Sequence, residues 1–134
     1  LPISKKNALV LGTGGASKAI LYALKSLNYK VTQVSREKKE GITTYAELNK
    51  EVMIQNQLII NCTPLGTFPN IEDCPNIPFE AISEKHILFD LIYNPEETTF
   101  LKHGKKNGAT IINGLNMLKL QAEKAWEIWN DSNL

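Results

Sequence analysis

Short apolar runs alternate along the chain with longer stretches in which apolar residues recur at helical spacing. The runs are rich in branched side chains, as expected of parallel strands that are covered on both faces. The longer stretches have the pattern of amphipathic helices. The pattern predicts strands over residues 7–11, 30–34, 57–61, 86–91 and 110–112, with a brief edge strand at 42–43. It predicts helices over residues 14–27, 45–52, 98–107 and 115–129, and a short turn near 80–82.

Local signals refine the bounds and the faces of these helices. Thr44 to Glu47 has the form of a capping box, which predicts the start of the second helix. Gly108 stands where a glycine usually ends a helix. The first helix should pack on the sheet through an apolar stripe made of Ala16, Ala19, Ile20, Ala23, Leu24 and Leu27.

Alternating strands and helices joined by short loops predict an α/β fold in a single domain spanning residues 1–134. The expected architecture is a doubly wound, mostly parallel sheet with helices on both faces. Right-handed crossovers would bring the carboxyl ends of the strands to one edge, where this class of fold binds its ligand. The segments expected at that edge are 12–17, 35–36, 61–66, 91–94 and 113–114.

The first of these segments is a glycine turn, Gly12-Thr13-Gly14-Gly15-Ala16-Ser17, between a predicted strand and a predicted helix. Glycines let the backbone turn sharply and approach a pyrophosphate, and the helix N-terminus offers unpaired N–H groups. The strict fingerprint would have Gly or Ala in place of Ser17. A glycine turn in this place can also be a simple connector.

The end of the second predicted strand indicates which dinucleotide such a turn would bind. Proteins that bind NAD have an Asp or Glu there, which accepts a hydrogen bond from the ribose hydroxyl. This chain has Ser35 and Arg36 instead, and a guanidinium binds a 2′-phosphate through paired hydrogen bonds. The position therefore favours NADP, with Lys38 or Lys39 as a source of further charge. The alternative is that Arg36 is an ordinary solvated arginine.

Further candidates follow the later predicted strands. Thr63 and Pro64 are interpreted as a backbone shelf under the nicotinamide ribose, or as a proline turn that serves only the fold. Tyr93 ends a strand and could contact a substrate or pack at the edge. Gln121 lies one helical turn beyond Met117, where it either caps local structure or reaches a ligand.

Composition narrows the classes of function. The 15 Lys and Arg residues nearly balance the 14 Asp and Glu residues, so bulk charge indicates neither a nucleic-acid nor a membrane surface. Cys62 and Cys74 lack a metal-type spacing, and His86 and His103 have no triad or metal arrangement nearby. We expect no metal site, structural or solvated histidines, and a reduced, cytoplasmic protein. The opening residues, which lack Met, read like a cut inside a longer protein.

Taken together, these motifs resemble the nucleotide-binding domain of shikimate dehydrogenases. The resemblance covers almost the whole chain, and its most specific part is Gly-x-x-Met-Leu-x-x-Gln-Ala. The motifs that carry it are Ala8–Ser17, Ser35-Arg36, Asn61–Gly66, Asp90–Pro95 and Asn113–Ala122. The family commonly has an acidic residue where Asn113 stands and a small one where Asn116 stands, so these two positions depart from its pattern.

The resemblance implies a Rossmann-like fold and NADP-dependent interconversion of 3-dehydroshikimate and shikimate in aromatic amino-acid biosynthesis, the chorismate pathway. It also implies roles for single residues. The expected cofactor contacts are Gly12, Gly14, Gly15, Ala16, Ser35, Arg36, Thr63, Pro64, Gly114 and Met117. The expected substrate contacts are Tyr93 and Gln121.

The family's catalytic Lys and Asp belong to an N-terminal domain that would precede Leu1, so no residue of this chain is predicted to be catalytic. We expect the chain to bind NADP(H), to share its substrate with that domain and not to turn over shikimate alone. Two alternatives stay open: a quinate/shikimate dehydrogenase domain that uses NAD(P), and a stand-alone nucleotide-binding or redox-sensing module. Tyr93 and Gln121 speak against the second, because such a module needs no substrate side.

Overall fold

The computed structural model describes residues 6–92 and 94–114, so the predicted helix over 115–129 lies outside the described residues. The strands are β1 Asn7–Leu11, β2 Lys30–Ser35, β3 Thr43–Thr44, β4 Leu58–Asn61, β5 Ile87–Asp90 and β6 Thr110–Ile112. The α-helices are α1 Gly15–Ser26, α2 Lys50–Gln55 and α3 Thr99–Lys106, and the 3-10 turns are η1 Tyr45–Glu47 and η2 Phe79–Ala81.

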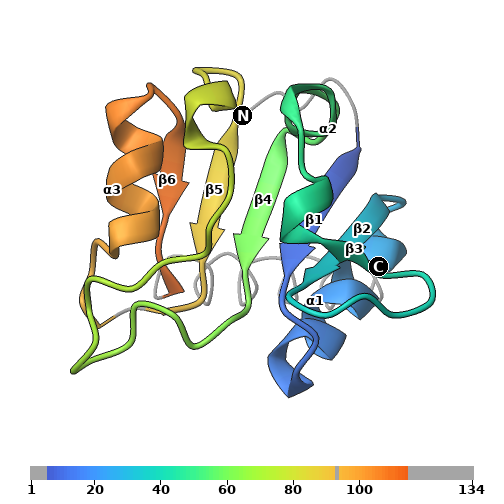
Figure 1. Ribbon diagram of the computed structural model, residues 1–134, viewed down its shortest axis with the longest axis horizontal. Helices are drawn as coiled ribbons and strands as arrows, with labels where there is room; N and C mark the ends of the chain where they lie inside the picture. The colour runs from blue at the N-terminus through green and yellow to red at the C-terminus, as the bar shows by residue number, and fades with distance from the viewer. Residues whose placement is uncertain (1–5, 93, 115–134) are drawn as a thin grey trace, which may run out of the picture.

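The six strands form one parallel sheet in the order β3-β2-β1-β4-β5-β6. All carboxyl ends therefore lie along one edge, the lower edge in Figure 1. After β1 the chain adds β2 and β3 on one side of β1, and it then crosses to add β4 on the other side. The strand order reverses between β1 and β4, which is where sheets of this class hold a ligand. The prediction of a doubly wound α/β sheet is confirmed.

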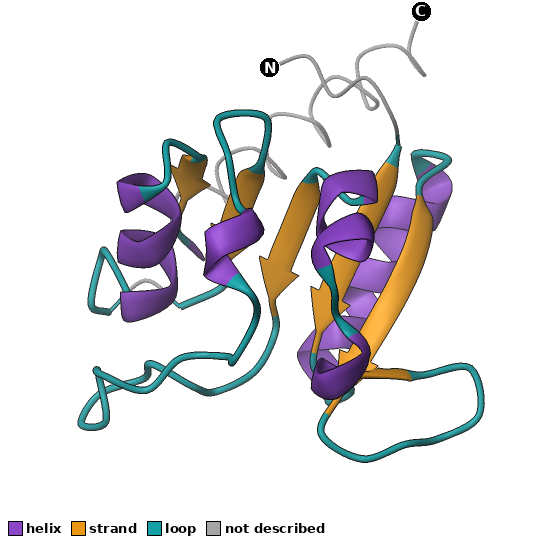
Figure 2. Ribbon diagram, turned by 45° about the horizontal axis from the view of Figure 1, so that its top comes forward, coloured by secondary structure: helices purple, strands orange, loops and turns teal. Residues whose placement is uncertain are grey.

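Helices cover both faces of the sheet, as predicted (Figure 2). Successive residues of β1 point to opposite faces, and all of Ala8 to Leu11 are fully buried. Leu9 and Leu11 join a core cluster with Met53 of α2 and Phe100 of α3. The cluster on the other face lies under α1 and contains Ala8, Val10, Ile20, Leu24, Leu58, Ile60 and Ile87.

The predicted inward stripe of α1 is only partly right. Ile20 and Leu24 are buried as expected, but the third buried residue of the helix is Ser17. Ala16 and Ala19 are exposed, and Leu27 is 41% exposed. The helix is therefore turned so that positions 17, 20 and 24 face the sheet, because Ser17 has polar partners beneath the glycine turn that repay its burial.

The predicted helix over 45–52 is wrong in its start. The Thr44 hydroxyl donates to the Glu47 carboxylate at 3.1 Å and does not cap the backbone. Only the 3-10 turn η1 follows. The α-helix α2 begins later, where the Asn49 side chain accepts a hydrogen bond from the Val52 N–H at 2.9 Å. Asn49 thus takes the capping role that the Thr44–Glu47 motif predicted for Thr44.

The α3 helix has the ends that its sequence predicts. The Thr98 side chain caps its start, and Gly108 follows its end with φ +88°, a conformation that favours glycine. Gly104 lets the helix lie close to β5, since an added Cβ would stand 2.5 Å from Leu88 Cδ2. None of the helices among residues 6–92 and 94–114 has the length and apolar character needed to cross a bilayer.

Candidate functional site

The glycine turn joins β1 to α1 at the carboxyl edge. The Gly12 N–H donates to the Val34 carbonyl at 2.8 Å, and Gly12 has φ +109°. An added Cβ there would meet the Cys62 backbone and Thr63 Cγ2 at 3.2 Å. Glycine is therefore required by both the conformation and the close approach of the loop after β4.

The next two glycines have a different environment. An added Cβ at Gly14 or Gly15 would find no atom within 4 Å among the described residues. Gly14, which has no side chain that could cap the helix, is the N-cap of α1, and the first turn of the helix carries no acidic residue. The first N–H groups of α1 and the positive end of its dipole thus lie beside space that no described residue fills, which is the environment that binds an anion such as a phosphate.

Ser17 and Gln33 hold the backbone of this turn through hydrogen bonds. The fully buried Ser17 hydroxyl donates to the Gly14 carbonyl at 2.6 Å. The Gln33 amide on β2 donates to the Gly12 carbonyl at 3.0 Å and to Ser17 Oγ at 3.3 Å. Sequence reasoning missed Gln33, although a long polar side chain inside a strand of mostly β-branched residues was a usable signal.

Ser35 and Arg36 lie beside the glycine turn, at the carboxyl end of β2. Ser35 pairs in register with Thr44 of β3, so Arg36 and Tyr45 follow as neighbours at the edge. Burial raises the pKa of Tyr45, and the positive charge of Arg36 opposes this. Arg36 is exposed, and the part of the chain that the structure describes gives it no ion-pair partner.

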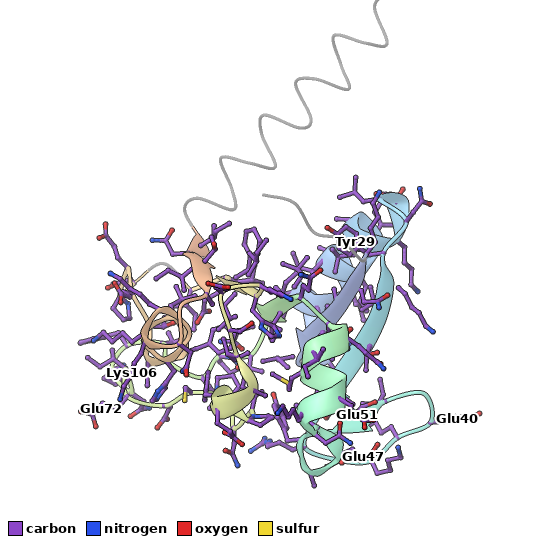
Figure 3. All side chains as sticks on the ribbon, turned by 90° about the horizontal axis from the view of Figure 1, so that it is seen from above. Tyr29, Glu40, Glu47, Glu51, Glu72 and Lys106 are labelled. Carbon is purple, nitrogen blue, oxygen red and sulfur yellow. The ribbon has the colours of Figure 1, made fainter. Side chains whose placement is uncertain are left out.

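Lys38, unlike Arg36, has an ion-pair partner among the described residues. Its ammonium group contacts the Glu47 carboxylate at 3.0 Å and donates to the Ile42 carbonyl at 3.2 Å. The bond from Lys38 is the main reason that the pKa of Glu47 is lowered. Lys39 is exposed, and Glu40 projects outward at the tip of the same loop (Figure 3). Of the cations predicted here, Arg36 and Lys39 remain available to a phosphate.

Thr63 and Pro64 lie in the loop after β4, across the glycine turn from Ser35. The Thr63 methyl group faces Gly12, whereas its hydroxyl is engaged within the loop. That hydroxyl donates to Asn61 Oδ1 at 2.6 Å and accepts from the Leu65 N–H at 3.2 Å. Pro64 is exposed. The predicted shelf is thus a rigid turn at the point where the strand order reverses.

A buried polar network joins this loop to the next strand. Asn61 and Asp90 are register partners on β4 and β5, and both are fully buried. The Asn61 amide donates to both Asp90 oxygens at 3.2 Å. The Ile92 N–H donates to Asp90 Oδ1 at 3.0 Å, and the Thr98 hydroxyl donates to Oδ2 at 2.7 Å. Burial raises the pKa of Asp90, and these hydrogen bonds oppose the increase.

The structure places Gly114 against the loop after β5. Its N–H donates to the Ile92 carbonyl at 3.3 Å. An added Cβ would overlap the Leu91 carbonyl, so only glycine fits. Tyr93, Met117 and Gln121 lie outside the described residues. The predicted site residues that are described all lie at the carboxyl edge, at the end of β2, at the start of α1 or in the loops after β1, β2, β4 and β6.

Both histidines lie away from this edge and serve the fold. His86 Nδ1 accepts from the Ser83 N–H, so Nε2 carries the proton and donates to the Met53 carbonyl at 2.6 Å. The His103 ring packs on Phe79 with centroids 4.7 Å apart. A cavity of about 600 Å³ beside His86 and Ile54 lies at the opposite edge of the sheet and includes no predicted site residue.

Cys62 should resist alkylation in the folded chain. Burial raises the pKa of its thiol to about 12, and the Asp90 carboxylate contributes to the increase. At pH 8 we expect iodoacetamide to label Cys62 much more slowly than the less buried Cys74, with rates rising about tenfold per pH unit because only the thiolate reacts. Equal labelling of the two folded cysteines, read by mass spectrometry, would contradict this.

The same shift predicts a loss of stability in alkali. The thiol ionises near its ordinary pKa of 9.0 in the unfolded chain and near 12 in the folded chain. Unfolding therefore releases a proton between these values, and the free energy of unfolding falls as the pH rises through that range. Cys62→Ala, compared with the parent by urea unfolding at pH 8 and pH 10, should remove that part of the pH dependence.

The strand order, with an open glycine turn at its reversal, defines a Rossmann-like α/β domain. The chain is 40% identical over 136 residues to the NADP(+) shikimate dehydrogenase of Methanococcus aeolicus, a match that covers 92% of this chain and 49% of that protein. It is 41% identical over 137 residues to that of Clostridium beijerinckii, covering 95% and 49%. The chain belongs to the shikimate dehydrogenase family.

A solved structure of similar fold is shikimate 5-dehydrogenase from Thermus thermophilus in complex with NADP(H) and shikimate. It has a TM-score of 0.73 and 30% identity, and the match covers 96% of this chain and 50% of that one. The chain thus spans about half the length of the curated relatives it matches. No family model matches the sequence.

Proposed function

We propose that this chain is the NADP-binding domain of a shikimate dehydrogenase. The whole enzyme would reversibly reduce 3-dehydroshikimate to shikimate with NADPH, and a second domain would supply its catalytic Lys and Asp. The observation that carries the proposal is the open glycine turn between Arg36 and Thr63, at the reversal of the strand order. The free thiols of Cys62 and Cys74 fit a reducing, cytoplasmic compartment.

The residues present fit such a cofactor. The N–H groups at the start of α1 would hold the pyrophosphate above Gly14 and Gly15, where a phosphate meets no Cβ. Arg36 and Ser35 would hold the 2′-phosphate, and Thr63 with Gly114 would line the nicotinamide end. When bound, the cofactor supplies or accepts a hydride. The chain's own residues orient it, and Tyr93 and Gln121 would face the substrate.

NADP is preferred over NAD in this proposal because of the charge at the end of β2. No carboxylate follows Ser35 directly, and Arg36 is exposed there without an ion pair in the described part of the chain. A quinate dehydrogenase of Corynebacterium glutamicum in complex with NAD has a similar fold, at 19% identity and a TM-score of 0.70. That likeness concerns the fold alone, so the choice of cofactor rests on Arg36.

The test separates cofactor binding from turnover. The purified 134-residue chain is expected to quench or shift NADPH fluorescence on titration, and to give no shikimate-dependent reduction of NADP+ above background. Shikimate dehydrogenase activity should require a second domain that carries the catalytic Lys and Asp. Failure to bind NADPH would overturn the proposal, whereas turnover by the chain alone would overturn only the division of labour between domains.

A further inference from the structure

Asp90 is a buried ionisable group that the proposed cofactor contacts do not use. It comes from β5, which lies between β4 and β6 in the sheet. Its side chain is fully buried, so it cannot touch a ligand. A buried carboxylate contributes little to stability by itself, because its desolvation offsets much of what its hydrogen bonds gain. The main effect of Asp90 is therefore on the positions of the groups that donate hydrogen bonds to it.

One arm of the network reaches the loop after β4. Asp90 accepts the Asn61 amide through both oxygens, which leaves Asn61 Oδ1 turned toward the loop. That oxygen accepts from the Thr63 N–H at 3.0 Å and from the Thr63 hydroxyl. The Thr63 donors thereby fix which way the Asn61 amide is turned. Thr63 is thus held by Asp90 through a single intermediate side chain.

The other arm reaches the segment after β6. Asp90 Oδ1 accepts a hydrogen bond from the Ile92 N–H, and the Ile92 carbonyl accepts one from the Gly114 N–H. The Cα of Gly114 lies so close to the Leu91 carbonyl that a side chain would overlap it. A change in the backbone of residues 91–92 would therefore move Gly114.

We propose, on the basis of the function proposed above, that Asp90 is a positioning residue for the nicotinamide end of the cofactor site. It holds Thr63 through Asn61 and Gly114 through Ile92, from the two strands that flank its own. The pyrophosphate and the 2′-phosphate depend on the loops after β1 and β2, which the network does not include. Its loss should therefore affect one end of the cofactor only.

The test is Asp90→Asn, which keeps the size of the side chain. Each oxygen of Asp90 accepts a hydrogen bond from the Asn61 amide. In the variant an NH2 group replaces one of these oxygens, so two donors face each other there and that hydrogen bond is lost. We expect NADPH to bind about tenfold more weakly, the effect of one lost hydrogen bond to a charged group. Adenosine 2′,5′-bisphosphate, which lacks the nicotinamide, should bind within about twofold of the parent.

Thr98→Val is the matched control. It removes the third donor to Asp90, on the α3 side, and should lower the melting temperature without changing the affinity of either ligand. Equal weakening of NADPH and adenosine 2′,5′-bisphosphate by Asp90→Asn would overturn the proposal, and so would unchanged NADPH affinity. If Asp90→Asn does not fold, Asn61→Leu breaks the Thr63 arm alone and should show the same selective loss.

Amide hydrogen exchange tests the positioning without any ligand. Exchange at the Thr63, Ile92 and Gly114 N–H groups should accelerate in Asp90→Asn, whereas Thr98→Val should accelerate only Leu101 and its helix turn. Unchanged exchange at Thr63 and Gly114 would overturn the proposal. Because this readout needs no cofactor, it remains decisive even if the parent chain binds no NADPH and the proposed function fails.

Discussion

Replacing Arg36 with alanine is expected to weaken NADPH binding about 100-fold and to leave NADH binding within about twofold. The reason is that a guanidinium can donate two charge-assisted hydrogen bonds to a 2′-phosphate, a group that NADH lacks. In the described residues its neighbour Lys38 is already paired with Glu47. Fluorescence titration of both cofactors, with parent and variant, measures the effect.

Lys39→Ala is the matched control for Arg36→Ala. Lys39 is an exposed cation in the same loop, so its loss removes the same net charge without removing the predicted contact. We expect it to weaken NADPH binding by no more than about threefold, and less at high salt, as for an exposed charge that attracts the phosphate through solvent. Equal losses for Arg36→Ala and Lys39→Ala, or equal losses for NADPH and NADH, would refute the 2′-phosphate role.

Replacing Gly12 with alanine is expected to lower the free energy of unfolding by about 2 to 4 kcal/mol and to abolish measurable cofactor binding. Gly12 has φ +109°, and an added Cβ would stand 3.2 Å from backbone atoms of Cys62. Backbone atoms cannot give way as a flexible side chain can. The turn or the loop after β4 must therefore move, and the turn is the proposed pyrophosphate site.

The control in the same turn is Gly15→Ala. Gly15 is the first residue of α1 and has no neighbour that an added Cβ would meet. Alanine there should leave stability unchanged or raise it by up to about 1 kcal/mol, because it favours the helix. Its methyl group projects into open space at the helix start, so cofactor affinity should still fall. Urea unfolding and NADPH titration of both variants would expose the contrast; a Gly12→Ala variant as stable as Gly15→Ala would contradict it.

The periodicity of the chain predicted the sheet and the helices α1 and α3, because burial on two faces leaves a strong pattern. Residues 8–11 and 58–60 are apolar at every position, as expected of the two central strands of a covered parallel sheet. The glycine turn and Arg36 could be placed relative to each other because both are set by one strand-helix-strand unit.

The features that sequence reasoning missed depend on contacts between distant segments. Asn61 meets Asp90 only once β4 and β5 pair in register, and Gln33 reaches Ser17 only after β2 lies beside β1. The Thr44–Glu47 motif failed for a similar reason. Lys38, brought near by the loop after β2, binds the Glu47 carboxylate that a capping box would use. Local motifs cannot predict such competition from the rest of the chain.

The strand order has a consequence for how the chain can assemble as it is made. Among the described residues β1 is the first strand, and it lies inside the sheet, between β2 and β4. Each later strand can therefore add to an edge that already exists: β2 and then β3 on one side, followed by β4, β5 and β6 on the other. None of these six strands has to insert between two that are already paired. Because synthesis runs from the N-terminal to the C-terminal side, a ribosome would thus deliver these strands in an order that builds the sheet outward from its centre.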